Sequence, residues 1–499
     1  MAEHEPSLLS SRLLAGSTLW SLAAQVIPAM VGVLAIPVII QRLGVDRFGV
    51  LTLAWMVIGY FSLFDFGLGR AVTKFAAELL GSRNSAGFNR LVWTAWYLMF
   101  AVGIVGAAIL AAIAPWLVST AIKLPGYLRH ETLQMFYLLA LSVPIVVLTA
   151  GFRGLLEGAQ LFRLTSLIKI PTGVLTFVTP LLVLPFTHNL ATIVLMLIAV
   201  RLVGAIAYAV LCHTAVHRHD APVAMDRSAA RSLIGFGAWM TVSNVISPLM
   251  GSVDRFLVGA LLSIAAVAYY ATPFEAVTKL LIIPSSITAV LFPAFSTASM
   301  IDRARLAELF RVGLRVVFLA MYPLVFLIVT FAPELLRFWL GDAFATQSSD
   351  ALRWLAVGVL MNSLASLPFA LLQGVGRSDT TAKIHLAEAP VYLGLVIWLI
   401  RQYGITGAAF AWSTRTTVDM CLLFLYSGRQ FRTTGSGWLR DLLVVVVLVA
   451  VLGVGPLLRS PLQKVILTSI LATLFAVFAW NWIGASVRRR YATGLPGDG

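Results

Sequence analysis

The sequence predicts an all-α membrane protein with about 14 transmembrane helices, counted at the usual span length of about 20 residues. Of its 499 residues, 60% are hydrophobic and 11% are charged, against roughly 25% charged in soluble domains. Apolar runs close to the length of a span recur from one end of the chain to the other. The alternating segments of about ten residues that indicate a membrane β-barrel do not appear in the sequence.

The expected spans follow one another with short connections. Their approximate centres are Pro28, Val57, Val102, Pro144, Val174, Leu197, Ser247, Pro284, Phe326, Leu360, Leu395, Thr416, Leu448 and Leu474. No connection is long enough for a soluble catalytic domain, which typically needs more than about 50 residues. No small-residue cleavage site follows the first apolar run, so we expect an uncleaved anchor. The chain is therefore not expected to be an enzyme.

Positive charge sets the expected orientation of these spans. The loops and ends on one side hold 23 Lys and Arg residues. The opposite loops hold 9, which are Arg42, Arg47, Lys123, Arg129, Arg337, Arg353, Arg401, Arg459 and Lys464. Because cytoplasmic loops carry the excess of Lys and Arg, both termini are expected in the cytoplasm. The net charge of +15 is therefore explained by topology, and a nucleic-acid partner is not expected.

Two pairs of segments indicate an internal repeat. "LLEGAQLFRLTSLIK" from Leu155 parallels "LLQGVGRSDTTAKIH" from Leu371, a shift of 371 − 155 = 216. "WSLAAQVIPAM" from Trp20 parallels "WMTVSNVISPL" from Trp239, a shift of 239 − 20 = 219. The repeat covers an even number of spans, so the two copies run the same way through the membrane.

The repeat divides the chain into two six-helix lobes and a C-terminal pair of helices. The expected boundaries are 1–212 for the first lobe, 213–231 for a cytoplasmic linker, 232–428 for the second lobe and 429–499 for the last two helices and a cytoplasmic tail. Paired lobes of this kind suit a carrier that binds its substrate near the midplane and rocks.

Two arginines are expected near the bilayer centre. At a rise of about 1.5 Å per residue, Arg415 lies about 15 Å below the outer entry of its helix, and Arg201 lies at a similar depth. Their helices correspond in the repeat. Buried charge is expensive in a membrane, and such residues by default mark a functional site. The planar guanidinium suits a diphosphate, which it can bind bidentately.

A second group of charges surrounds a hairpin that is expected to turn near Ser263. Asp254 and Arg255 precede the turn, and Glu275 and Lys279 follow it at i, i+4 spacing. Arg415 and Asp419 share that spacing in the less favourable order.

Two interpretations of these buried charges stay open. They form salt bridges that hold helices in register, or the cations Arg201, Arg255, Lys279 and Arg415 line a cavity that receives an anion. Asp254, Glu275 and Asp419 then serve as ion-pair or coupling residues.

Three further residues belong to the same question. Asp65 lies beside Arg70 at the cytoplasmic end of the second span, where a local ion pair is the simpler explanation. His385 and Glu388 lie on one face near the cytoplasmic end of the eleventh span, where they could carry a proton or a cation. Coupling to H⁺ or Na⁺ is therefore an open expectation. The sequence predicts no metal site, and no bound cofactor is expected.

The run "RLGVDRFGVLTLAWMVIGYFSLFDFGLGRAVTKFAAEL" resembles the start of the polysaccharide-transporter flippases. These proteins belong to a superfamily that also includes multidrug and toxin extruders and lipid II flippases. "GLLEGAQLFRL" and "YGITGAAFAW" are also similar to that family. The resemblance implies alternating access by two six-helix lobes, often around a cation-lined cavity. It implies that the substrate is an undecaprenyl-diphosphate-linked oligosaccharide, moved from the inner to the outer leaflet of a bacterial inner membrane.

The sequence thus favours a flippase for exopolysaccharide, O-antigen or capsule biosynthesis. Its expected partners are the lipid-linked oligosaccharide, membrane lipids, and a polysaccharide polymerase and chain-length regulator. An ion-coupled exporter of cationic drugs is the alternative with the same fold, but its site should be net acidic. A membrane-embedded polymerase or glycosyltransferase is a third alternative, although the sequence has no Asp-x-Asp pair, P-loop or nucleophile elbow. The last two helices, which lie outside the repeat, are expected to help form an apolar groove for the lipid tail.

Overall fold

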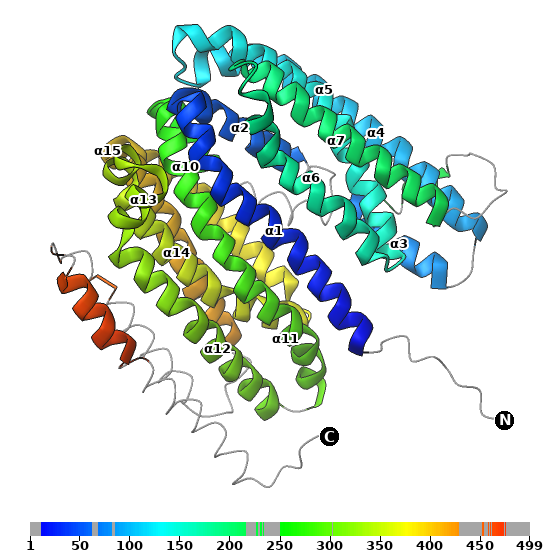
Figure 1. The fold of residues 1–499 in the computed structure, drawn as a ribbon. Coiled ribbons are helices and arrows are strands. Elements are labelled where there is room, and N and C mark those ends of the chain that lie inside the picture. Colours follow the sequence, from blue (N-terminus) through cyan, green and yellow to red (C-terminus); the bar gives the residue numbers. More distant parts are fainter. Residues whose placement is uncertain are drawn as a thin grey trace. The chain divides into compact units, whose positions relative to one another are not determined.

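The computed structural model describes residues 11–61, 68–81, 85–215, 250–301 and 303–428. It also describes residues 226–227, 230–231, 233, 452–453, 458, 460, 462–473 and 475. Every regular element in these ranges is helical, as Figure 1 shows. The chain divides into two compact units, Met1–Ala271 and Thr272–Gly499.

The first unit contains most of the long helices of the N-terminal half. They are α1 (Ser11–Leu43), α2 (Val45–Phe61), α3 (Leu68–Gly81), α4 (Ser85–Trp116), α5 (Gly126–Gly158), α6 (Phe162–Val183), α7 (Leu190–Ala215), α9 (Val253–Leu261) and the first half of α10 (Ile264–Thr278). A π-helical turn, Leu117–Ala121, continues α4. Helix α5 is the buried centre of this unit and packs against α3, α4 and α7. Its neighbour α4 turns a row of large apolar side chains outward, as a lipid-facing helix does.

The second unit continues α10 through a short 3₁₀ turn, Lys279–Leu281. Its further helices are α11 (Ile282–Ile301), α12 (Arg303–Thr330), α13 (Ala332–Leu340), α14 (Asp342–Gly374) and α15 (Ser378–Gly428). Here α14 is the buried centre and packs against α11, α12, α13 and α15.

Nine helices within the described residues are long and apolar enough to cross a membrane. The expected centres Ser247, Leu448 and Leu474 lie outside the described residues, and the other expected centres fall inside helices. Helix α15 merges two expected spans, and its 51 residues are interrupted at Gly404, whose φ is 59°. The prediction of a polytopic all-α membrane fold is therefore confirmed, whereas the count of 14 spans stays a prediction.

The repeated segments adopt the same turn in both halves. In the first, Ala159, Gln160 and Leu161 donate backbone N–H bonds to Leu155, Glu157 and Leu156. In the second, Val375, Gly376 and Arg377 donate to Leu371, Gln373 and Leu372. Each donor and each acceptor is displaced by the predicted 216 residues. The repeat found in the sequence therefore has a structural counterpart.

Two short helices, α3 and α13, lie where the sequence predicts only loops between spans. Helix α3 packs on α5, where a Cβ at Gly154 would lie 2.4 Å from the carbonyl oxygen of Gly69. Helix α13 is amphipathic, with Leu336 buried and Phe338 almost fully exposed. Neither is long enough to span a bilayer, which needs about 20 residues.

The segment Leu462–Thr473 attaches to the second unit. Lys464 Nζ lies 2.6 Å from Glu334 Oε1 of α13, and the ring of Phe475 stacks on Tyr322 of α12 at 5.3 Å. Part of the last predicted helix thus lies against the second unit. The predicted boundaries 212/213, 231/232 and 428/429 are not tested by these contacts and stay predictions.

Candidate functional site

A cavity of about 530 Å³ lies between the two halves of α15. Its mouth holds Arg377, Asp379 and Lys383, next to the start of the helix. Its inner part holds Glu388, Tyr392 and Arg415, and apolar side chains, Leu395 and Leu422 among them, complete the wall. A volume of this size is typical of pockets for small ligands.

Glycines allow the two halves of α15 to fold back on each other. Gly404 has a positive φ that other residues rarely adopt. A Cβ at Gly407 would lie 2.0 Å from the carbonyl oxygen of Leu399, so only glycine fits this close approach. The second half is then fixed on α14, because the Ser413 hydroxyl donates a 2.5 Å hydrogen bond to the carbonyl of Trp354.

Arg415 enters the cavity from the second half of α15. Its guanidinium carbon lies 5.5 Å from the centre of the Tyr392 ring, a cation–π distance. Its Nε is buried and makes no hydrogen bond to the described part of the chain. No ion pair joins Arg415 to Asp419 among the described residues, although their spacing allows one. The guanidinium is therefore available to an anion.

His385 and Asp419 form an ion pair across the hairpin. His385 Nε2 lies 3.4 Å from Asp419 Oδ1, and both side chains are mostly buried. The imidazole also stacks on Phe369 of α14, with ring centres 5.9 Å apart. This pair holds the two halves of α15 together beside the cavity.

Glu388 is the most unusual group of the cavity. It is 8% exposed, and neither carboxylate oxygen has a hydrogen-bond partner within the described residues. A buried carboxylate without a donor has a large desolvation penalty. It is relieved when the group takes up a proton, a cation or a ligand donor. Glu388 can therefore act as an acceptor inside the cavity.

The predicted residue Arg201 lies on α7 of the first unit. It is half-buried within a membrane span, and no described acidic side chain pairs with it. The neighbouring Val203 is 67% exposed. Arg201 thus lies on a spanning helix, as the sequence predicts, and is not among the residues that line the cavity of Arg415.

The other predicted charges lie elsewhere. Asp254 is fully buried and accepts a 2.5 Å hydrogen bond from the Tyr270 hydroxyl, which favours a packing role. Arg255 is also buried, on the same helix α9. Glu275 and Lys279 form the expected ion pair at 3.3 Å, and both side chains are over 40% exposed. Asp65 lies outside the described residues.

The structure therefore brings together Arg415, Asp419, His385 and Glu388 from the predicted set. The spacing of Arg415 and Asp419 on one helix was visible in the sequence. Their proximity to His385 and Glu388 depends on the hairpin at Gly404 and could not be read from spacing alone.

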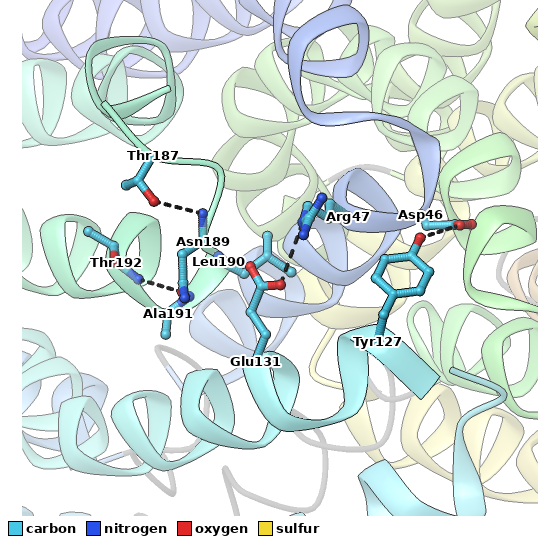
Figure 2. Close-up of polar contacts among 9 residues, drawn as sticks. All are labelled: Asp46, Arg47, Tyr127, Glu131, Thr187, Asn189, Leu190, Ala191 and Thr192. Carbon is cyan, nitrogen blue, oxygen red and sulfur yellow. Dashed lines mark hydrogen bonds and ion pairs between the residues drawn. The ribbon is translucent and has the colours of Figure 1, made fainter. Parts of the chain in front are cut away.

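A buried carboxylate in the first unit was missed by the sequence interpretation. Glu131 of α5 is 8% exposed, accepts a hydrogen bond from the Leu190 N–H at the start of α7, and lies 3.5 Å from Arg47 Nε. Figure 2 shows this group, in which Asn189 also caps α7 through the Ala191 N–H at 2.8 Å. The signal was one acidic residue in an apolar helix. Through these contacts Glu131 joins the N-terminal ends of α2, α5 and α7.

Comparison with known proteins identifies the relatives of this chain. Residues 39–349 match the family described as "Polysaccharide biosynthesis protein". A curated relative from Shigella flexneri, named "Putative O-antigen transporter", is 30% identical over 416 residues, covering 82% of this chain and 97% of the relative.

Solved structures share the fold at low sequence identity. The lipid II flippase MurJ in an inward closed conformation has a TM-score of 0.69 at 12% identity, covering 93% of this chain and 99% of that chain. An inward-facing MATE-family multidrug resistance transporter of the MOP superfamily has a TM-score of 0.67 at 15% identity, covering 84% of this chain and 96% of that chain. The two-lobed transporter fold expected from the resemblance is confirmed.

Proposed function

The chain belongs to the polysaccharide biosynthesis protein family, and from this premise we propose that it is a transporter that flips lipid-linked oligosaccharides across a membrane. The observation that carries the proposal is the 30% identity to the Shigella flexneri protein named "Putative O-antigen transporter", over 97% of that protein. The fold shared with the lipid II flippase supports it. The chain is a transporter and not an enzyme, which sets aside the polymerase and glycosyltransferase alternatives.

The proposed substrate is an undecaprenyl-diphosphate-linked oligosaccharide, moved from the inner to the outer leaflet of a bacterial inner membrane. Both termini and the 213–231 linker would then face the cytoplasm, in accord with the 23 to 9 charge asymmetry of the loops. A polysaccharide polymerase and a chain-length regulator would act on the product at the outer face.

Arg415 and Arg201 are the proposed diphosphate contacts. Arg415 supports this role because its guanidinium lines the 530 Å³ cavity with its Nε unbonded. Arg201 supports it because a lone guanidinium within a span favours an anion. A drug exporter for cations fits less well, since Arg201 and Arg415 are two positive charges within the spans that no described acidic side chain pairs with.

Glu388 is the proposed coupling group, with His385 and Asp419 beside it. Export would be driven by H⁺ or Na⁺, which the unbonded carboxylate accepts when the diphosphate is absent. The alternating occupation of one cavity by a cation and an anion is a simple way to link the two movements.

Complementation tests the function directly. A strain that lacks its own O-antigen flippase, supplied with this chain and the matching sugar pathway, should display surface polysaccharide. Proteoliposomes that hold a fluorescent isoprenyl-diphosphate oligosaccharide should expose the sugar to an external lectin. A protein that is correctly inserted yet leaves the sugar unflipped in both assays would contradict the proposal.

A further inference from the structure

The hairpin between α9 and α10 has a tip, residues 259–264, that packs against earlier segments of the first unit. Helix α9 ends at Leu261 and α10 begins at Ile264. The turn is closed by Ser263, whose Oγ accepts a 3.1 Å hydrogen bond from the Ala266 N–H. This agrees with the turn that the sequence predicts near Ser263.

Lys123 makes two hydrogen bonds to this tip. Its backbone N–H donates to the Gly259 carbonyl at 3.0 Å, and its Nζ donates to the Leu261 carbonyl at 2.6 Å. The last carbonyls of a helix have no partner within the helix and carry partial negative charge. An ammonium group is therefore suited to hold the end of α9.

Helix α2 meets the other side of the tip at a glycine. A Cβ at Gly49 would lie 2.2 Å from the Ile264 carbonyl oxygen, so no other residue fits without a shift of backbone. A Cβ at Gly259 would lie 3.1 Å from Val267 Cγ2 and 3.7 Å from Ile122 Cγ2, so it fits with a small shift of the Val267 side chain. The tip is thus held on two sides by segments more than a hundred residues earlier in the chain.

The tip is grouped with different parts of the chain by the sequence repeat and by its contacts. The repeat assigns residues 232–428 to the second lobe, whereas the first compact unit extends to Ala271. The tip therefore belongs to the second lobe by sequence and to the first by contact. Such a contact is expected where two rocking lobes meet and close one end of a carrier.

We infer that the tip is the outer gate in its closed state and that Lys123 is the latch that holds it. The inference rests on the proposed alternating access, and on the charge rule, which puts Lys123 outside. The latch acts on the gate without touching the substrate, so Lys123 is a positioning residue.

Pro273 supplies a hinge for the gate. It lies inside α10, two residues after the first unit ends at Ala271. Proline has no N–H to donate within the helix and permits a bend there. The tip can therefore leave the first unit while the rest of α10 stays with the second.

A cross-link tests the gate. In a background without Cys212 and Cys421, the pair Ile122→Cys and Gly259→Cys should form a disulfide on oxidation, because the Cβ at Gly259 lies near the Ile122 side chain. The oxidised protein should stop flipping, and reduction should restore it. Each single cysteine variant is the control. Absence of the cross-link, or full flipping by the cross-linked protein, would overturn the inference.

Cysteine labelling tests the latch without any substrate. In the Gly259→Cys variant, an impermeant maleimide added from outside should react about tenfold faster when Lys123 is changed to Ala, a factor in keeping with the loss of a charge-assisted hydrogen bond. Arg129→Ala, which removes an exposed cation of α5, should leave the rate unchanged. Equal rates for Lys123→Ala and Arg129→Ala would exclude the latch, whether or not the protein proves to be a flippase.

Discussion

The α6–α7 pair of the first unit and the two halves of α15 in the second occupy the same place in the repeat and carry different chemistry. At the repeat offset of 216 residues, Thr172 corresponds to Glu388 and Val203 corresponds to Asp419. The Thr172 hydroxyl donates a 2.8 Å hydrogen bond to the Ile168 carbonyl and is satisfied, whereas the Glu388 carboxylate has no donor among the described residues. One scaffold thus holds a lone arginine in the first unit and an arginine with acceptor groups in the second.

This difference teaches how a duplicated fold can divide a task. Positive charge alone is sufficient to attract a diphosphate, and Arg201 and Arg415 both offer it. Uptake and release of a cation need groups that change charge. In α15 the carboxylate of Glu388 and the guanidinium of Arg415 line one cavity, and His385 lies beside it against Asp419. The first unit would then bind, while the second would bind and couple.

The largest effect is expected from the two arginines. Changing either Arg201 or Arg415 to Ala should reduce flipping by about two orders of magnitude, since a buried charge contact is worth about 2–5 kcal/mol. Lys should rescue each only partly, because it lacks the planar fork. Flipping is measured by lectin access, with protein levels checked by immunoblot. Normal flipping by both Ala variants would show that neither binds the diphosphate.

Substitution of one glycine in each unit tests how tightly the two units are packed. Gly407→Ala should lower the free energy of unfolding in detergent by about 2–4 kcal/mol, because its Cβ would meet the Leu399 carbonyl oxygen at 2.0 Å. Gly204→Ala in α7 is the control, since its Cβ would meet side chains and no backbone, the Thr172 methyl at 2.8 Å and Ile168 Cγ2 at 4.0 Å, and side chains can move. Equal losses for the two variants would mean that the turn in α15 is not the tighter one.

Glu388→Gln separates binding from coupling. The neutral amide cannot exchange a proton, so the flipping rate of the variant should not depend on a proton gradient. With the gradient applied, its rate should be about tenfold lower than that of the unchanged protein. Thr172→Val, at the corresponding position of the first unit, should keep that dependence. Transport is followed in proteoliposomes with an imposed pH difference. Full gradient dependence in the Gln variant would remove Glu388 from the coupling role.

The smallest effect concerns the attachment of Leu462–Thr473. Burial raises the pKa of Glu334, but the hydrogen bond from Lys464 and nearby positive charge outweigh it and hold the pKa below its ordinary value of 4.5. The pair therefore stabilises the folded protein above about pH 4.5, and this contribution is lost as the pH falls through the lower, folded-state value.

Glu334→Gln should lower the free energy of unfolding at neutral pH by about 1 kcal/mol, since the pair is partly exposed. The effect of the same change should decline as the pH falls through the lowered, folded-state pKa of Glu334, because the native carboxylate then becomes protonated. Asp342→Asn is the control, because its ion pair with Arg337 is mostly exposed. A Glu334→Gln effect that does not decline at acid pH would contradict the assignment.

Much of the fold could be predicted from the sequence, because a bilayer dictates the length and composition of its helices. The two expected spans centred at Leu395 and Thr416 both lie in α15, where they are joined by a tight turn at Gly404. Helix α3 could not be anticipated, because its place depends on glycines of α5 that let two backbones approach.

The site was harder to predict, since depth along a helix does not fix which neighbours a side chain meets. Arg415 and Glu388 share a cavity, as a functional site requires. Asp254 is another charged residue that the sequence analysis singles out, yet its carboxylate accepts a hydrogen bond from the Tyr270 hydroxyl. The partner group, and not the depth, separates a candidate site residue from a packed one.

The Glu131 contact has a consequence for how the chain assembles in the membrane. A ribosome delivers Arg47 first, then Glu131, and Leu190 only after 59 further residues. Arg47, whose Nε lies 3.5 Å from the Glu131 carboxylate in the folded protein, is thus synthesised before α7. We therefore expect the start of α7, and with it Arg201, to take its place against helices that have already entered the membrane.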